Sequence, residues 1–315
     1  MIIKRNFSPT KIWQYIKKPM TFVILWSTLV CVVFNLTGTQ ALVVNFTPIG
    51  VLGSALAIFI AFRNNAAYSR WWEARQIWGG VVNSSRVLCR LIITFVDSHA
   101  HQENYEKERS EQFKSRLVHQ CIAWPIALRL HLRNQESWEE LMPHLQNEAY
   151  VELQEKQNKP LHLQMQIGRQ IYQAMANGTL GGFDSFQMEG QLLALATYQG
   201  AAEKIKSTPM PRQYDFFTRV FVVLFSLLLP FGLLSLFQSE TARPYSWLVI
   251  VFSILIAGVF IIMERTGAAL EDPFENSITD VAMTSLCNTI ERDLREALGE
   301  TQLPEKLQPI NGYLF

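Results

Sequence analysis

The segment from Pro48 to Arg75 constrains the fold of this chain more than any other part of it. No charged residue occurs from Pro48 through Phe62, and a basic, aromatic stretch follows at once. Neither glycine nor proline interrupts Ser54 to Arg75, so one helix is predicted to run through the change. An apolar helix with a basic end is typical of a membrane span that continues into the cytoplasm. The basic and aromatic residues are Arg63, Arg70, Trp71, Trp72 and Arg75.

Composition agrees with a membrane protein. Hydrophobic residues make up 49% of the 315 residues and charged residues 17%, so the chain is more apolar than an average soluble protein. A net charge of +1 argues against nucleic acid as a partner. The four cysteines show no CxxC spacing, and we expect buried or lipid-facing thiols rather than a zinc site or disulfides.

Four membrane spans are predicted. The first is short for a hydrocarbon layer of about 30 Å, so residues before Thr21 are expected to extend it. Pro230 is expected to break the third. The spans are Thr21–Leu36, Leu42–Phe62, Val220–Phe237 and Pro244–Met263.

Residues 1–40 also allow a second interpretation, as a signal peptide with Lys17 and Lys18 in its basic region. The cleavage site that Thr37–Gln40 offers is weak, and a second apolar stretch follows immediately, so a span is favoured.

Basic residues set the direction of the spans. The loop Thr37–Pro48 has no charged residue, whereas basic residues gather before the first span and after the second. The positive-inside rule therefore predicts a multi-pass protein of the inner (plasma) membrane with both termini in the cytoplasm. The basic residues are Lys4, Arg5, Lys11, Lys17 and Lys18 before the first span, and Arg63, Arg70 and Arg75 after the second.

Residues 64–215 read as cytoplasmic helices. Leu117, Cys121, Trp124 and Leu128 form an amphipathic stripe that contains Pro125, a residue that can kink the helix. Another helix is predicted over Ile278–Leu298, and nothing reads as a strand. Breaks are predicted at Asn134–Glu136, Asn158–Pro160 and Asn177–Gly182, with Asp184 or Ser185 capping the helix that then ends near Thr208.

Three groups of motifs resemble the bestrophin family in its bacterial branch. They are VLG, FRN and AAYSRWWEAR between Val51 and Arg75, TPMP at Thr208–Pro211, and LEDPF with LCNTIERDL between Leu270 and Leu294. The similarity extends from Thr21 to about Leu298, and the order and spacing of the motifs make it specific.

The resemblance implies an all-α fold in which four transmembrane helices continue into a cytoplasmic helical bundle, assembled as a ring-shaped homopentamer. Four spans are also too few to enclose a dedicated pore within one chain, which favours a symmetric ring. The expected parts are 1–63 with the first two spans, 64–215 as the cytoplasmic region, 216–263 with the last two spans, and 264–315 as a cytoplasmic helix and tail.

Ser54, Ile58 and Phe62 are four residues apart and share one helix face. Spacing alone favours helix packing or lipid contact. The resemblance instead places these residues at the apolar neck of a pore, where the family usually has a bulky apolar residue at the first position. Ser54 should therefore widen and wet the outer end, while Ile58 and Phe62 keep a dewetting constriction.

Met210 lies between Pro209 and Pro211, which limit its backbone. An ordinary loop residue is one interpretation. By resemblance, Met210 forms the cytoplasmic aperture of the pore, where a flexible methionine ring would act as a soft gate.

Acidic residues after the fourth span are the candidate metal ligands. By resemblance, Asp272 and Asp280 lie near the calcium-binding positions of eukaryotic bestrophins, but the acidic run is reduced, so no cofactor is required and calcium binding is not expected. The alternative for Asp272 is an N-cap before Pro273. The other acids considered are Glu271 and Glu275.

Arg63 and Asn64 follow the neck. A ring of five arginines would favour anions, but an anchor at the membrane interface is the favoured role of Arg63. The six histidines, at positions 99, 101, 119, 131, 144 and 162, show no metal-binding spacing and are expected at the surface. No enzyme signature is present.

The sequence thus predicts a homopentameric channel that passes monovalent ions across the lipid bilayer, with the resemblance to bacterial relatives leaning toward sodium over chloride. The alternatives are an anion channel, a small-solute transporter and a membrane-anchored scaffold. Uncharged spans favour passive conduction, because coupled transporters usually carry charged relays.

Overall fold

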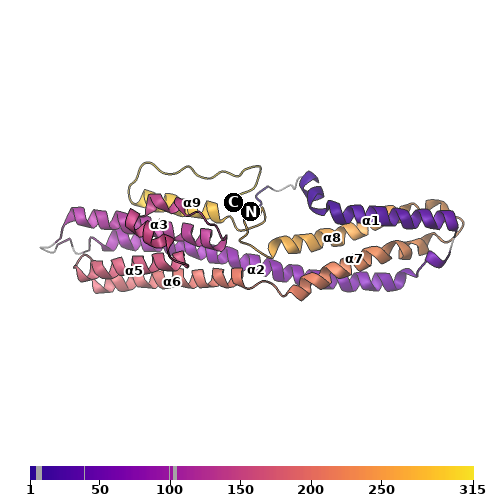
Figure 1. Ribbon diagram of the computed structural model, residues 1–315, viewed down its shortest axis with the longest axis horizontal. Coiled ribbons are helices and arrows are strands. Elements are labelled where there is room, and N and C mark those ends of the chain that lie inside the picture. The colour runs from indigo at the N-terminus through magenta and orange to yellow at the C-terminus, as the bar shows by residue number, and fades with distance from the viewer. Residues whose placement is uncertain (5–8, 39, 99, 102–104) are drawn as a thin grey trace. The chain divides into compact units, whose positions relative to one another are not determined.

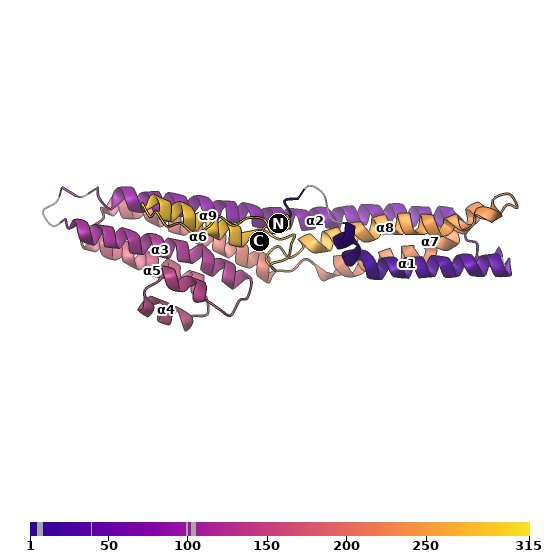
Figure 2. The same ribbon diagram turned by 90° about the horizontal axis from the view of Figure 1, so that it is seen from above.

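The computed structural model describes residues 1–4, 9–38, 40–98, 100–101 and 105–315. The described residues form helices with no strand, only two isolated β-bridges, which confirms the all-α prediction. The α-helices are α1 (Pro9–Thr37), α2 (Phe46–Phe95), α3 (Lys107–Leu132), α4 (Asn147–Gln154), α5 (Lys159–Ala176), α6 (Gly182–Ser207), α7 (Arg212–Leu234), α8 (Leu248–Leu270) and α9 (Met283–Ala297) (Figures 1 and 2). The short 3₁₀ helices are η1 (Gln40–Leu42), η2 (Glu139–His144), η3 (Ser235–Phe237) and η4 (Arg243–Tyr245).

The chain divides into two compact units. Unit 1 comprises Met1–Ile3, Trp71–Thr208 and Pro273–Phe315, and unit 2 comprises Lys4–Arg70 and Pro209–Asp272. Helix α2 is one continuous helix of 50 residues whose first part belongs to unit 2 and whose second part belongs to unit 1. The prediction that one helix continues through the change at Arg63 is therefore confirmed.

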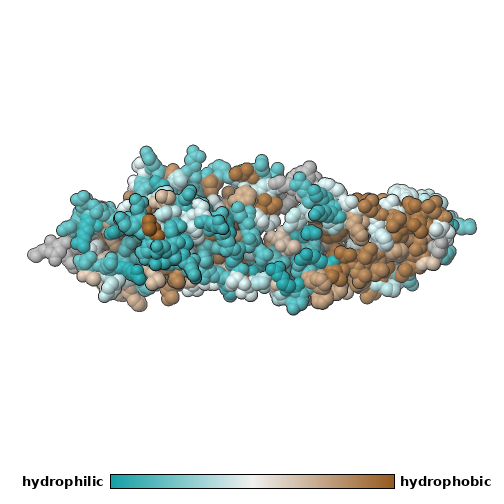
Figure 3. Space-filling view, viewed as in Figure 1, coloured by the Kyte–Doolittle hydropathy of each residue, from teal (hydrophilic) through white to brown (hydrophobic). Residues whose placement is uncertain are grey.

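Among the described residues, four helices are long and apolar enough to cross a membrane; α1, α7 and α8 belong to unit 2, and α2 begins there. Their candidate spans begin at Trp13, Gln40, Arg212 and Leu248. On the face shown in Figure 3, apolar side chains gather over these helices. The first span covers 25 residues from Trp13, so residues before Thr21 do extend it, and it exceeds the apolar core of a signal peptide.

Pro230 does not break the third span, contrary to the sequence prediction. Helix α7 continues through it to Leu234. A proline inside a membrane helix is tolerated where neighbouring groups satisfy the freed carbonyls. Close by, the indole of Trp26 on α1 donates to the carbonyl of Leu227 at 3.0 Å, which ties α1 to α7.

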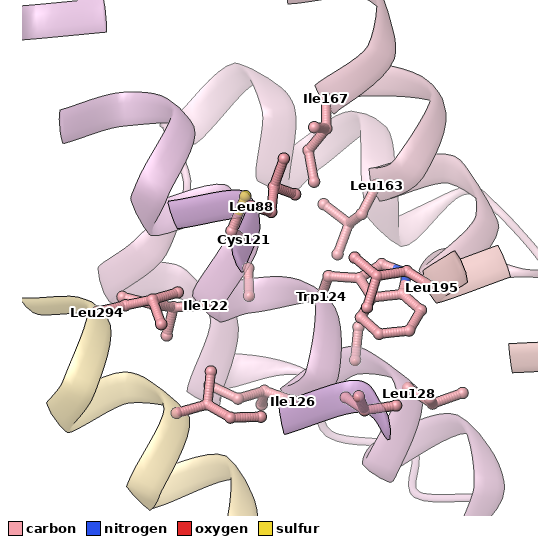
Figure 4. Packing of buried hydrophobic residues seen from close by; sticks show 14 of the residues in the cluster. Leu88, Cys121, Ile122, Trp124, Ile126, Leu128, Leu163, Ile167, Leu195 and Leu294 are labelled. Atoms are coloured by element: carbon pink, nitrogen blue, oxygen red, sulfur yellow. The ribbon is translucent and has the colours of Figure 1, made fainter. Parts of the chain in front are cut away.

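Unit 1 is a helical bundle around α3. The predicted stripe Leu117, Cys121, Trp124 and Leu128 is buried in one hydrophobic cluster with residues of α2, α5, α6 and α9, part of which Figure 4 shows. Most of the rest of α3 is buried too, including Lys114 and Arg129, so this helix is central rather than amphipathic. Their charges are paired with Asp97 and Glu140, which lets charged side chains enter the core.

The predicted breaks in unit 1 are confirmed, but one predicted cap is wrong. Asn158 caps α5 by accepting a hydrogen bond from the Leu161 amide at 3.0 Å. Helix α6 begins at Gly182 with Gly181 at the N-cap, so Asp184 and Ser185 lie inside its first turn. All four cysteines are free and buried, as expected.

Candidate functional site: the exposed face of helix α2

The inward face of α2 in unit 2 packs tightly on α7. Leu56 and Ile60 are buried, and Gly53 meets the ring of Phe225 so closely that an added Cβ would lie 2.9 Å from it. Gly232 makes a similar approach from α7 to Ile49. Small residues at such contacts are how membrane helices reach close packing, and they fix which face of α2 turns outward.

The outward face carries the three residues that the sequence singled out. Ile58 is 60% exposed and Phe62 is 71% exposed. Ser54, four residues before Ile58, is exposed as well. The Ser54 hydroxyl donates to the carbonyl of Gly50 at 3.1 Å, so its hydrogen bond is made to the preceding turn of the same helix. These side chains do not pack inside unit 2. Their role as a pore neck stays a prediction.

The free face of α2 differs from those of the other spans. Most exposed residues in the apolar parts of α1 and α8 are large and apolar, for example Leu25, Leu29, Leu255 and Val259. Helix α2 instead exposes Ser54 among small and apolar residues, and only 22% of its apolar window is buried, against 33–50% in the other three spans. A face that is both less apolar and less covered suits water or neighbouring copies better than lipid.

Arg63 follows Phe62 in α2, about 100° further round the helix, and is only 2% exposed. Its guanidinium pairs with Asp215 of α7 at 2.7 Å and with Glu271 at 3.4 Å, and donates to the carbonyl of Glu264 at 3.1 Å. A ring of pore-facing arginines does not fit this buried and paired side chain, whereas the role of Arg63 as an anchor at the membrane interface stays a prediction. The positive charge of Arg63 is neutralised within a buried network that joins α2, α7 and α8.

Asn64 strengthens the same junction. Its amide nitrogen donates to the carbonyl of Met263 at 2.9 Å, and its side-chain oxygen lies against Gly267, where an added Cβ would be 2.0 Å away. Glu271 keeps one carboxylate oxygen, Oε1, buried without a hydrogen-bond partner among the described residues. Since Arg63 directly follows Phe62, anchoring it inward holds Phe62 outward.

The other predicted site residues lie outside regular helices. Met210 is partly exposed in the connection between α6 and α7. Asp272 is exposed and no helix begins at Pro273, so the predicted N-cap is wrong; α9 begins only at Met283. Nothing in the described residues tests Met210 as an aperture.

Asp280 is buried and its carboxylate is already bonded by Ser277. The Ser277 hydroxyl donates to one oxygen, and the Ser277 amide donates to the other at 3.1 Å. Burial raises the pKa of Asp280 while these bonds oppose the rise. Among the described residues, no group of three or more His, Cys, Asp and Glu side chains is placed to hold a metal ion.

No pattern in the sequence indicates the pair of histidines in unit 1. His144 is 8% exposed and contacts His119, so the expectation of surface histidines is wrong for this pair. His101 is exposed as expected, and His99 lies outside the described residues. Lone histidines spaced 25 residues apart have no recognisable pattern, because the contact forms only when η2 folds against α3.

The fold and the α2 face together define a four-span α-helical membrane protein with a long helix whose outward side is uncovered. The family model of the bacterial and fungal bestrophin proteins matches residues 6–296, and the chain belongs to the bestrophin family. This confirms the resemblance drawn from the sequence motifs.

Individual relatives agree with the family. The chain is 30% identical over 260 residues to the voltage-dependent anion channel-forming protein RSc3414 of Ralstonia nicotianae, covering 82% of this chain and 79% of the relative. It is 29% identical to YneE of Escherichia coli, which carries the same description, over 90% and 88% of the two chains. A crystal structure of a bacterial bestrophin homologue from Klebsiella pneumoniae superposes with a TM-score of 0.77 at 27% identity, over 90% and 98%.

Proposed function

We propose that this chain forms a homopentameric membrane channel for small monovalent ions, with the exposed face of α2 lining the pore. The observation that carries the proposal is the stripe Ser54, Ile58 and Phe62, which is exposed in the subunit and held outward by Arg63 on the buried side. Five copies that bring these faces together would cover the least buried span and enclose an apolar neck.

Such a neck acts on ions by size and dehydration. An ion in a ring of apolar side chains loses water without gaining ligands, which creates a barrier. The neck residues are uncharged, and the nearest arginine, Arg63, is neutralised by Asp215 and Glu271. Neither sign of charge is therefore favoured by the neck itself.

The relatives are named as anion channels, and these names support anions as the preferred ions. The sodium preference expected from the resemblance finds no support in them, nor in the described residues. Reversal potential in a planar bilayer under a salt gradient tests the whole proposal. A shift of the reversal potential toward the chloride equilibrium potential supports an anion channel, and a shift toward the sodium equilibrium potential supports a cation channel. If assembled protein carries no current, the channel proposal is refuted.

We expect the purified protein to contain five chains. Because one subunit exposes the α2 face and holds only four spans, a closed ring is needed to enclose a pore. Native mass measurement in mild detergent should give five copies of the 36.2 kDa chain. A conducting monomer would refute the shared pore.

We also propose that conduction needs no calcium. Asp280 is buried and bonded to Ser277, and Asp272 is exposed and belongs to the other unit. Calcium prefers six to eight oxygen ligands, which these two residues do not supply. Current should be unchanged when a chelator replaces calcium in the bath. A steep loss restored by about micromolar calcium, as at sensor sites, would contradict this.

A further inference from the structure

A polar pocket lies between α3 and α5 in unit 1. The residues that α3 contributes follow the spacing i, i+3, i+4 and i+7, and those from α5 and its C-cap repeat that spacing, so each set shares one helix face. The pocket offers about 110 Å³ of space to water. One water molecule needs about 10–15 Å³ of such space, so several waters or one compact ion can enter. The lining residues are Arg109, Gln112, Phe113 and Arg116 of α3, Gln170, Gln173 and Ala174 of α5, and Asn177 and Thr179 just after α5.

The charged groups in the wall of this pocket are two arginines. Arg109 and Arg116 lie about two turns apart on α3, and both are exposed. Neither guanidinium forms an ion pair with a described residue, and the described residues that line the pocket include no acid. Glu111, on the same helix, is paired with Lys114 at 3.2 Å. Two positive charges therefore face the pocket without a partner in the part of the chain that the structure describes.

The other polar side chains can donate hydrogen bonds. Gln112, Gln173 and Asn177 carry amide N–H groups, and Thr179 carries a hydroxyl. Gln170 is held in place because its Nε2 donates to Oε1 of Gln120 at 2.8 Å. The wall thus combines two cations with several neutral donors, the set of groups that binds an oxyanion.

The apolar side of the pocket is rigid. Phe113 of α3 is 8% exposed and Ala174 of α5 is 4% exposed, and both belong to the hydrophobic cluster of unit 1. Because the polar residues lie one helical turn from these buried positions, packing of the core fixes the helix faces that carry them. The arrangement of the wall is therefore set before any ligand binds.

The end of α5 is closed in a way that suits an anion. Gly178 has a φ of +76°, which favours glycine, and the chain turns back so that the Thr179 amide donates to the carbonyl of Ala174 at 2.8 Å. The amide of Gly178 donates to the carbonyl of Met175 at 3.1 Å. Bare carbonyls at a helix C-terminus would repel an anion, and these bonds reduce that repulsion.

The chemistry of the wall indicates a phosphate group. Each guanidinium presents a planar fork of N–H donors that matches two oxygens of a phosphate, and two of them balance a charge of about −2. A halide offers one acceptor atom, and a carboxylate offers two oxygens and one charge. A phosphate group has enough oxygens to reach both Arg109 and Arg116 and to accept from the neutral donors as well.

A larger groove adjoins the pocket. Gln112 and Arg116 line both, and the groove of about 640 Å³ continues along α3 to His119 and the end of η2. This volume lies in the range of about 300–1,000 Å³ that is typical of small-molecule sites. A phosphate held in the pocket can therefore carry an organic group that lies in the groove.

We propose that the pocket between α3 and α5 binds a phosphate group, carried by inorganic phosphate or by a small phosphate monoester. Arg109 and Arg116 neutralise its charge, and the amides and Thr179 bind its remaining oxygens. The site lies wholly within unit 1 and does not depend on the channel proposal.

Calorimetric titration of the full-length protein in detergent tests this inference. The probes are inorganic phosphate and glycerol phosphate at about pH 8, where a phosphate monoester is fully ionised. Sodium chloride keeps the ionic strength equal, so general screening is constant. At least one probe should bind saturably. Arg109→Gln and Arg116→Gln should each weaken binding about tenfold, as expected for the loss of a charged hydrogen-bond donor, and the double variant should abolish it.

Two further variants make the result specific. Arg169→Gln is the matched control, because Arg169 is exposed on α5 beside Gln170 but does not line the pocket. It removes the same charge and should keep the wild-type affinity. Gln112→Glu keeps both arginines but places a carboxylate between them, which should pair with them and weaken binding. This change at an exposed position also tests the site if an arginine variant fails to fold.

The order of the two probes identifies the source of the phosphate. Tighter binding of glycerol phosphate assigns the site to a monoester whose organic group occupies the groove, and tighter binding of inorganic phosphate assigns it to the free ion. If neither probe binds saturably to the wild type, or if Arg169→Gln weakens binding as much as Arg116→Gln does, the proposal is wrong.

Discussion

Alanine at both Ile58 and Phe62 should raise the single-channel current. Both side chains are exposed on α2, so truncation removes little packing within the subunit. On the proposed assembly they form rings that strip water from the ion, and smaller side chains reduce that penalty. If the barrier falls by about 1 kcal/mol and the neck limits conduction, the current should rise about fivefold. Single-channel recording in a bilayer provides the measurement.

Exposed apolar residues on the other spans provide the control. Leu29 on α1 is 54% exposed and Leu255 on α8 59% exposed, close to the exposure of Ile58. Leu29→Ala and Leu255→Ala should leave the current unchanged, since these positions face lipid on the proposed assembly. An equal effect of all four truncations would mean that α2 does not line the pore.

Ser54 allows the opposite change at the same neck. Ser54→Ile restores a bulky apolar residue at an exposed position and breaks only a bond to the carbonyl of Gly50. The current should fall, because the outer end becomes narrower and drier. Met210→Ala provides a separate comparison, since it increases the current only if the proposed aperture, and not the neck, limits conduction.

The spans and the long α2 helix could be predicted because their signals are local. An apolar run without charges identifies a span, and the absence of glycine and proline from Ser54 to Arg75 predicts a continuous helix. That Ile58 and Phe62 share a face was also predictable, because they lie four residues apart. Whether that face meets water, lipid or another chain is a property of the assembly.

Arg63 shows why the long-range contacts could not be predicted from the sequence. Its partners Asp215 and Glu271 are 152 and 208 residues away in sequence, so no local pattern reveals that its charge is neutralised. A lone arginine after an apolar run reads as an interface anchor, because that is where most such residues lie. The prediction of surface histidines was wrong for His119 and His144 for the same reason, since their contact joins α3 to η2.

Removal of the Arg63 charge should destabilise the protein strongly. Arg63→Gln leaves Glu271 buried without this cation and leaves Asp215 paired with the exposed Arg219 alone, and one oxygen of Glu271 already lacks a hydrogen-bond partner among the described residues. Removing one member of a buried ion pair costs about 3–5 kcal/mol, because the remaining charge is neither solvated nor paired. Denaturant unfolding in detergent should show a loss of this size. Arg86→Gln is the matched control: Arg86 pairs with Asp293 at 2.5 Å, but the side chains are 48% and 34% exposed, so the cost should be about 0–1 kcal/mol.

A compensated variant separates lost pairing from lost packing. In Arg63→Met with Asp215→Asn and Glu271→Gln, no charged member of the network remains, so most of the stability lost in Arg63→Gln should return. Arg219, which also pairs with Asp215, is 62% exposed and remains hydrated when that acid is neutralised. If the stability returns while the current stays altered, Arg63 orients Phe62 by its specific bonds to α7 and α8. A triple variant no more stable than Arg63→Gln would show that packing of the guanidinium, rather than its charge, holds α2 in place.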